Sequence, residues 1–412
     1  MKRIIVLLAW AFPILAFSQS NNAPSSYDPH DITITGYLQT QFQKAQSDGI
    51  ASFSAGDFDP HSNQRFMIRR GRLKIDRVDK YSSVVFQLDA TQDGVKLMDA
   101  FIQLNHPDYK ALRLTAGLFN RPFGYSIVYS SGYRDFPERP RVFQTLMPRE
   151  RDLGAMLTFH PQSSKWKFIN LDLAIINGSG LTAKDYDDNK DFVGNLSFTF
   201  DSLAQGNLHL AFGGSVYKGS VRNNTDTYYT PEGSGYTAHT DEAFIGKNIG
   251  RSYYGANMQI EYTNTFGLTS LKAEYITGDQ PGVAGSDAVL APYASQSFAT
   301  QPQTDLYKRS FSGAYIWFTQ EIGHTGLTAI ASYDLYDPNK KASGMAIGET
   351  GNHTNSGDIK YSTFGYGLTY QLSKRLKLTV YNEQVTNEKT QVEGYTNDLK
   401  DNVFTTRLQY RW

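Results

Sequence analysis

Sixteen segments of this chain alternate between apolar and polar residues, and most of them run for 10–14 residues. The last segment shows the pattern clearly. Its apolar set is Phe404, Leu408, Tyr410 and Trp412, with Thr406 as a polar exception, and its polar set is Thr405, Arg407, Gln409 and Arg411. Because the side chains of a strand point alternately to its two faces, one face suits hydrocarbon and the other suits water. Strands of this length cross a bilayer core when they are tilted.

The predicted strands begin near residues 31, 65, 80, 95, 110, 151, 165, 191, 206, 251, 267, 308, 324, 359, 374 and 399. An even number of strands is what closure of an antiparallel bacterial barrel requires. A lysine or arginine that faced lipid would cost about 2–4 kcal/mol near the midplane. The polar sets should therefore line the lumen.

The connections between these strands alternate in length. Short turns are expected at 78–80, 106–109, 161–164, 263–266 and 373–374, and long links at 46–64, 120–150, 177–190, 219–250, 279–307, 336–358 and 387–398. The one exception is the tight turn Gln92–Gly94. A barrel with short periplasmic turns and long extracellular loops sorts its connections in this way. Residues 31–412 are thus predicted to form one all-β domain, a 16-stranded antiparallel transmembrane β-barrel.

The N-terminus has the pattern of an export signal. Lys2 and Arg3 precede an apolar stretch from Ile4 to Phe17, and small residues follow. This predicts a signal peptide over residues 1–18, a short periplasmic segment over 19–30, and a place in the outer membrane of a Gram-negative bacterium. The chain has no Cys, which excludes disulfides and thiolate chemistry, and its formal net charge is zero. Any preference for anions must come from local placement of charge.

The link 120–150 combines basic and apolar residues. Its arginines are Arg121, Arg134, Arg139, Arg141 and Arg149. Its apolar residues are too frequent for a freely solvated loop, so it is expected to fold inward against the barrel wall. The guanidinium groups would then line a constriction and bind phosphate-like or carboxylate anions. The alternative is a surface lobe whose arginines pair with its own acids or with lipid phosphates.

The second strand adds a line of basic residues. Met67, Gly71, Leu73 and Ile75 read as its outward face, which places Arg70, Arg72 and Lys74 on the lumen side. Successive positions on one face lie about 6.6 Å apart, so an anion could pass between neighbouring charges. Arg69 breaks this pattern and is expected either to snorkel or to lie at an interface.

Three residues on neighbouring strands should face the same lumen. Arg113 is expected to add to the basic line, and Asp89 and Asp99 either pair with it or form an acidic wall. A basic line wholly neutralised by the two aspartates remains an open alternative.

Five segments resemble the phosphate-selective porin O and P family. They are Arg65–Leu73, Asp99–Phe101, Ala116–Gly124, Glu138–Arg139 and Pro148–Gly154. The resemblance implies a sixteen-stranded, trimeric outer-membrane porin with an inward loop and an arginine ladder that conduct anions such as phosphate or pyrophosphate. The matching positions are Arg70, Arg72, Arg121, Arg139 and Arg149. The lysine cluster with which members of the family attract anions is not evident in this sequence. Its absence weakens the expectation of phosphate specificity more than the expectation of anion passage.

The resulting hypothesis is passive diffusion of small anions through an arginine-lined eyelet. The alternatives are a nonspecific general porin, an outer-membrane transporter of other small solutes and, with least support, an enzyme barrel. No His-x-Ser or Ser-x-His pair is present, and the eight His residues are scattered. We therefore expect no catalysis, no metal or other cofactor and no nucleic-acid partner. The expected partners are small anions, outer-membrane lipid, lipopolysaccharide and, from the resemblance, two further copies of the chain.

Overall fold

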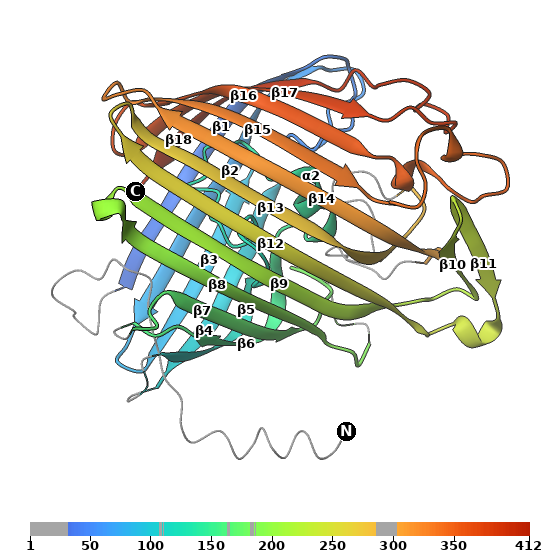
Figure 1. Ribbon diagram of the computed structural model, residues 1–412, viewed down its shortest axis with the longest axis horizontal. Coiled ribbons are helices and arrows are strands. Elements are labelled where there is room, and N and C mark those ends of the chain that lie inside the picture. Colours follow the sequence, from blue (N-terminus) through green and yellow to red (C-terminus); the bar gives the residue numbers. More distant parts are fainter. Residues whose placement is uncertain are drawn as a thin grey trace.

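The computed structural model describes residues 32–106, 109, 111–162, 165–181, 185, 187–285 and 303–412. Sixteen strands close into one antiparallel barrel (Figure 1). Its first half contains β1 (Ile32–Ala45), β2 (Gln64–Val78), β3 (Ser82–Thr91), β4 (Gly94–Asn105), β5 (Leu112–Asn120), β6 (Arg151–Phe159), β7 (Ile169–Ile176) and β8 (Asp191–Leu203). Its second half contains β9 (Leu208–Arg222), β12 (Asn248–Asn264), β13 (Gly267–Gly282), β14 (Leu306–Glu321), β15 (Leu327–Asp337), β16 (Tyr361–Gln371), β17 (Leu376–Asn387) and β18 (Val403–Arg411).

The predicted barrel is confirmed, and each strand begins within four residues of its expected start. The expected signal peptide and N-terminal segment lie outside the described residues. Antiparallel pairing of β1 with β18 closes the barrel, from Tyr37 opposite Arg411 to Ala45 opposite Val403. The C-terminus lies at the end that carries the short turns (Figure 1).

Two further strands stand outside the wall. β10 (Thr227–Glu232) and β11 (Gly235–Thr240) form a hairpin within the link between β9 and β12, which pair directly with each other. β10 also pairs in parallel with the start of β14. The strand pattern did not predict this hairpin, because it lies beyond the lipid-facing wall, where it contacts the start of β14 and the long loop at Asn352.

In the described residues, helical structure is confined to short pieces. α2 (Arg141–Leu146) lies in the 120–150 link, inside the barrel (Figure 1). The 3-10 turns are η1 (Ala204–Gly206), η2 (Glu242–Phe244), η3 (Gly344–Ala346) and η4 (Ser356–Asp358). Within the described part of the chain, no helix is both long and apolar enough to span a membrane.

The two faces of the wall are inverted relative to a soluble protein. Leu38, Leu408 and Tyr410 are exposed on the outside of β1 and β18. Gln39 and Gln409 are buried inside, where the Nε2 of Gln39 donates to the Oε1 of Gln409 at 2.6 Å. Apolar groups thus meet lipid and polar groups satisfy one another in the lumen, as the alternation predicted.

A β-bulge interrupts the pairing of β1 with β2. Gln39 lies opposite Arg70 and Thr40 lies opposite Ile68, so Arg69 is an extra residue in β2. The bulge changes which residues face the lumen. Arg69 points inward beside Arg70, and both bind Glu138, although the sequence pattern predicted that Arg69 would snorkel or lie at an interface. Met67, which the pattern placed outside, faces in, where its Sδ accepts a hydrogen bond from the Nε2 of Gln41 at 3.3 Å.

The barrel wall is shorter beside this bulge, because the neighbouring strand β3 ends before β2 does. β3 pairs with β2 only between Arg72 and Val78, because the β3–β4 hairpin ends at Gln92–Gly94. The part of β2 that carries Arg69 and Arg70 therefore rises beyond its neighbour. Its backbone N–H groups at Gly71 and Ile68 are met by side chains of the hairpin, Asp89 at 3.0 Å and Gln92 at 3.1 Å.

Candidate functional site

The link 120–150 fills part of the barrel interior with apolar contacts. Phe136 stacks on Trp317 with ring centroids 5.1 Å apart, and Phe143 meets the edge of Tyr315 at 6.0 Å. Both wall residues belong to β14. This packing confirms the inward fold of the loop. Burial of such large side chains contributes about 1.5–3 kcal/mol each, which is why the loop does not stay in solvent.

A carboxylate of the loop is the meeting point of three arginines. Glu138 accepts two hydrogen bonds from Arg69 at 2.8 Å, one from Arg70 at 2.7 Å and one from Arg407 of β18 at 2.8 Å. Burial alone would raise the pKa of Glu138, but the three guanidinium groups hold it well below its usual range. The nearby Arg134 donates to the backbone oxygens of Phe136 and Pro137.

A second carboxylate holds the loop from the wall side. Glu274 of β13 accepts hydrogen bonds from the backbone N–H groups of Tyr125 at 3.2 Å and Ser126 at 3.0 Å, and from the hydroxyl of Tyr315 at 3.2 Å. Gly124 has φ +60°, and a Cβ at that position would lie 1.6 Å from Glu274 Oε1. Only glycine lets the backbone approach this closely.

The Gly124→Ala variant should therefore loosen the loop. We expect a loss of about 1–3 kcal/mol from the left-handed backbone and the forced displacement of Glu274. The measurement is the midpoint of urea unfolding in detergent. Gly233→Ala is the matched control, since Gly233 has φ +57° and open space around the Cβ position. Equal losses in the two variants would show that the Glu274 contact does not hold the loop.

Several of the predicted site residues are engaged in buried ion pairs. Arg121, 1% exposed, pairs with Asp152 at 3.0 Å. Arg139 pairs with Glu150 and also donates to the backbone oxygen of Ser126 at 2.7 Å. These two arginines of the loop have little surface to offer a solute, because their donors are used to hold the loop together.

Asp99 and Arg141 have other partners than the sequence suggested. Asp99 pairs with Arg151 of β6 at 2.9 Å rather than with the basic line of β2. Arg141 stacks between two rings, with its guanidinium carbon 3.6 Å from the centroid of Tyr361 and 4.1 Å from that of Phe53. Arg141 thus lies where α2 packs against the first long loop and the start of β16.

The basic line on β2 is partly neutralised. Arg72 pairs with Asp89 at 3.1 Å, and Lys74 pairs with Asp76 at 2.8 Å. Arg70 is neutralised by Glu138 and not by either predicted aspartate. Arg113 is half-buried on β5 and interacts electrostatically with Asp172.

One cavity, of about 220 Å³, lies between β2, the β3–β4 hairpin and the loop. Its lining includes six basic residues, Arg69, Arg70, Arg72, Lys96, Arg139 and Arg149, and four acidic ones, Asp89, Asp93, Glu138 and Glu150. Three of these acids already bind arginines. Among the described residues, the side chains of Lys96 and Arg149 have no hydrogen-bond or ion-pair partner. The cavity thus brings part of the predicted set together and adds Lys96.

The backbone beside Arg149 is strained. Arg149 has φ 59° and Glu150 has φ 63°, which are left-handed conformations that side chains of this kind rarely adopt. Glu150 is held by Arg139 and Arg151. This fixes the turn and leaves the Arg149 side chain on the cavity side. Strain of this kind is often found at functional sites.

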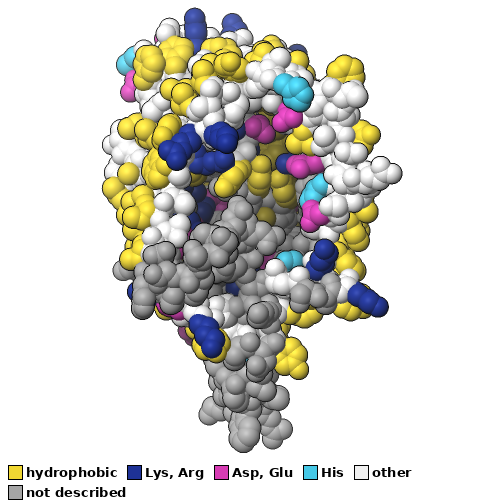
Figure 2. All heavy atoms as spheres, turned by 90° about the vertical axis from the view of Figure 1, so that its left-hand side faces the viewer, with side chains coloured by type: hydrophobic (Ala, Val, Ile, Leu, Met, Phe, Trp, Pro, Cys, Tyr) yellow, Lys and Arg dark blue, Asp and Glu magenta, His cyan; other side chains and the backbone are white. Residues whose placement is uncertain are grey.

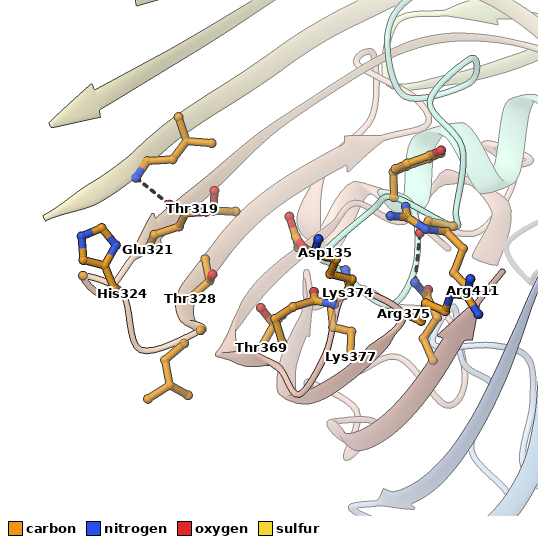
Figure 3. Close-up of a pocket in the computed structure, with 18 residues that line it drawn as sticks. Asp135, Thr319, Glu321, His324, Thr328, Thr369, Lys374, Arg375, Lys377 and Arg411 are labelled. Carbon is orange, nitrogen blue, oxygen red and sulfur yellow. Dashed lines mark hydrogen bonds and ion pairs between the residues drawn. The ribbon is translucent and has the colours of Figure 1, made fainter. Parts of the chain in front are cut away.

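A larger cavity, of about 450 Å³, opens at the short-turn end. Figure 2 shows this end hollowed, with Lys and Arg side chains on one rim and Asp, Glu and His side chains on the other. Lys374, Arg375, Lys377 and Arg411 come from the β16–β17 turn, β17 and β18, and face Glu321 and His324 of β14 and the next turn (Figure 3). The sequence interpretation missed this group. The sequence signal that could have revealed it is the pair of adjacent cations Lys374 and Arg375, which lie in a short turn next to the polar face of the last strand.

Comparisons with known proteins agree with this architecture. The family model described as phosphate-selective porin O and P matches residues 45–412. No curated protein matches the chain. Among solved structures, the chain is similar to the outer membrane channel DcaP of Acinetobacter baumannii, with 11% identity, coverage of 97% of this chain and 100% of that one, and a TM-score of 0.56.

Two other structures have comparable similarity. OmpF of Salmonella typhi, in complex with daunomycin, has 11% identity, coverage of 92% and 97%, and a TM-score of 0.52. In-vitro folded OmpT of Vibrio cholerae, in its trimer form, has 10% identity, coverage of 93% and 99%, and a TM-score of 0.51. At such identities these likenesses establish the fold alone. The family match covers nearly the whole barrel, including its inward loop, and the chain therefore belongs to the phosphate-selective porin O and P family, as an integral protein of the outer membrane of a Gram-negative bacterium.

Proposed function

We propose that this porin lets small anions, including phosphate-like oxyanions, diffuse passively across the outer membrane. The observation that carries the proposal is the cavity of about 220 Å³ between β2, the β3–β4 hairpin and the inward loop, which we call the long-loop cavity. Its basic residues outnumber its acidic ones by six to four. Three of the four acids are already bound by arginines, so the unpaired charge on the lining is mainly positive. In a narrow passage with protein walls, such charge acts on an ion more strongly than it would in water.

The path that this charge favours runs along β2. An anion that enters from the long-loop end meets Lys96 and Arg149, whose donors are unpartnered among the described residues. Arg72 and Lys74 continue the line at intervals of about 6.6 Å on the same strand face. Their carboxylate partners, Asp89 and Asp76, keep binding weak enough for release. Conduction requires this balance between entry and escape.

We further propose that the chain assembles as a homotrimer with its outer surface in contact with lipid and lipopolysaccharide. The support is the trimer form of a similar barrel and the apolar outer face of the wall. The long-loop end would then face outward and the short-turn end would face the periplasm.

A general porin with weak selectivity is the second candidate. The observation in its favour is the extent of pairing, since Arg70, Arg72, Arg121 and Arg139 each contact a carboxylate. Paired charges produce a weaker field along the pore than free ones. The two candidates differ in the expected ratio of anion to cation permeability.

The reversal potential across a planar bilayer under a KCl gradient separates them. We expect a preference for chloride, reduced current on addition of phosphate, and a loss of most of the preference in the double variant Lys96→Gln/Arg149→Gln. The control is Lys389→Gln/Lys400→Gln, which removes the same charge from exposed long-loop positions and should leave the reversal potential unchanged. A cation preference in the unmodified channel would refute the proposal.

A further inference from the structure

The cavity at the short-turn end has the size and the lining of a binding site for a small organic molecule. Its volume of about 450 Å³ falls in the range of sites that hold small organic molecules. Its lining combines cations, an aromatic ring, hydroxyl groups, amides and carboxylates. A lining of this kind can contact the charged, polar and apolar parts of one organic solute at the same time.

One rim of this cavity offers two unengaged cations. Lys374 and Arg375 are exposed, and the structure records no ion pair or hydrogen bond for either cationic group among the described residues. Lys377, by contrast, pairs with Asp135 at 2.9 Å. A guanidinium group and an ammonium group on one turn suit a phosphate, because the first binds two oxygens as a planar fork and the second acts as a point charge.

An aromatic ring lies next to these cations. Tyr133 of the inward loop is 59% exposed, and the guanidinium carbon of Arg411 lies 4.3 Å from the centroid of its ring. Arg411 covers one face, and the rest of the ring borders the cavity. A large exposed phenol ring is an apolar platform on which a flat ring can pack while its polar groups stay wet.

The wall opposite the cations is rich in hydrogen-bonding groups. Figure 3 shows Thr319, Glu321, His324 and Thr328 across the cavity from Lys374, Arg375 and Arg411. Glu321 accepts a hydrogen bond from the N–H of Leu268 at 2.9 Å and keeps further acceptor capacity. Threonine hydroxyls both donate and accept. This wall matches a solute with several hydroxyl groups and would repel a second phosphate.

We propose that this cavity binds phosphorylated monosaccharides, with the phosphate on Lys374 and Arg375, the sugar ring against Tyr133, and the sugar hydroxyls on Thr319, Thr328 and Glu321. The inference rests on the proposed anion passage and names a substrate class for it. A sugar phosphate that has crossed the narrower long-loop cavity would be held at this mouth before release. Inorganic phosphate would use only the cationic rim.

Isothermal titration of the full-length protein in detergent tests this assignment without requiring conduction. The probes are glucose 6-phosphate, glucose and inorganic phosphate. We expect glucose 6-phosphate to bind about fivefold more tightly than inorganic phosphate, and glucose to bind more weakly than either. In Lys374→Gln/Arg375→Gln the Kd of glucose 6-phosphate should rise about tenfold. In Tyr133→Leu its advantage over inorganic phosphate should disappear. Lys389→Gln/Lys400→Gln is the control of equal charge change.

The possible outcomes separate the two proposals. Equal affinity for glucose 6-phosphate and inorganic phosphate, or an unchanged Kd in the Lys374 and Arg375 variant, would overturn the sugar phosphate assignment even if the channel prefers anions. A cation preference in the reversal potential would instead overturn the proposed anion passage. The single variants Lys374→Gln and Arg375→Gln alter exposed turn residues and provide folded protein if the double variant is unstable.

Discussion

Replacing Glu138 by Gln should increase both the conductance and the anion preference of the channel. Glu138 is the shared partner of Arg69, Arg70 and Arg407. Without its charge, the buried guanidinium groups of Arg70 and Arg407 and the partly exposed one of Arg69 repel one another and lose their strongest acceptor. Breaking a buried pair by removal of one partner typically costs about 3–5 kcal/mol. The loop should therefore move away from β2 and β18, and the freed arginines should attract anions.

The measurement is single-channel conductance together with reversal potential in a KCl gradient. We expect a rise of about twofold or more in conductance and a reversal potential shifted further toward chloride, since the freed guanidinium groups face the lumen. Glu349→Gln is the control, because Glu349 is exposed on a long loop and has no recorded ion pair in the described part of the chain. Unchanged conductance in Glu138→Gln would mean that this carboxylate does not hold the loop in the pore.

Replacing Arg121 by Met should destabilise the barrel strongly without changing its selectivity. Arg121 and Asp152 are 1% and 0% exposed, and Asp152 also accepts hydrogen bonds from the backbone N–H groups of Gly180 and Leu153. Removal of either partner leaves an unpaired charge in the interior, which we expect to cost about 3–5 kcal/mol. The family resemblance made Arg121 a candidate anion contact, but its position gives it a structural role.

A double-mutant cycle distinguishes these roles. Arg121→Met and Asp152→Asn should each lower the free energy of unfolding, measured by urea denaturation in detergent. The double variant should lose less than the sum of the single losses, because it leaves no uncompensated charge. Channels of Arg121→Met that do fold should keep the reversal potential of the unmodified protein. A large shift toward cations in those channels would place Arg121 on the ion path after all.

The alternation of residues was sufficient to predict the barrel, because a strand that separates lipid from water needs one face of each kind along its whole length. It located all sixteen wall strands and the inward loop. It did not locate the β10–β11 hairpin, which lies beyond the lipid-facing wall, and it misassigned Arg69 and Met67. A single inserted residue reverses which side chains face the lumen, and the sequence carries no separate mark for it.

Residue type and spacing by themselves determined that this chain forms a closed wall of strands with arginines directed toward its interior. Only the tertiary structure decided which of those arginines are neutralised. Glu138 is 69 residues from Arg69 and 269 residues from Arg407 along the chain, and the cations of the short-turn mouth come from turns and strands that meet only when the barrel closes. Electrostatic pairing depends on distances of a few ångströms in space, and those distances are set by barrel closure and by the packing of the loop against aromatic residues of the wall.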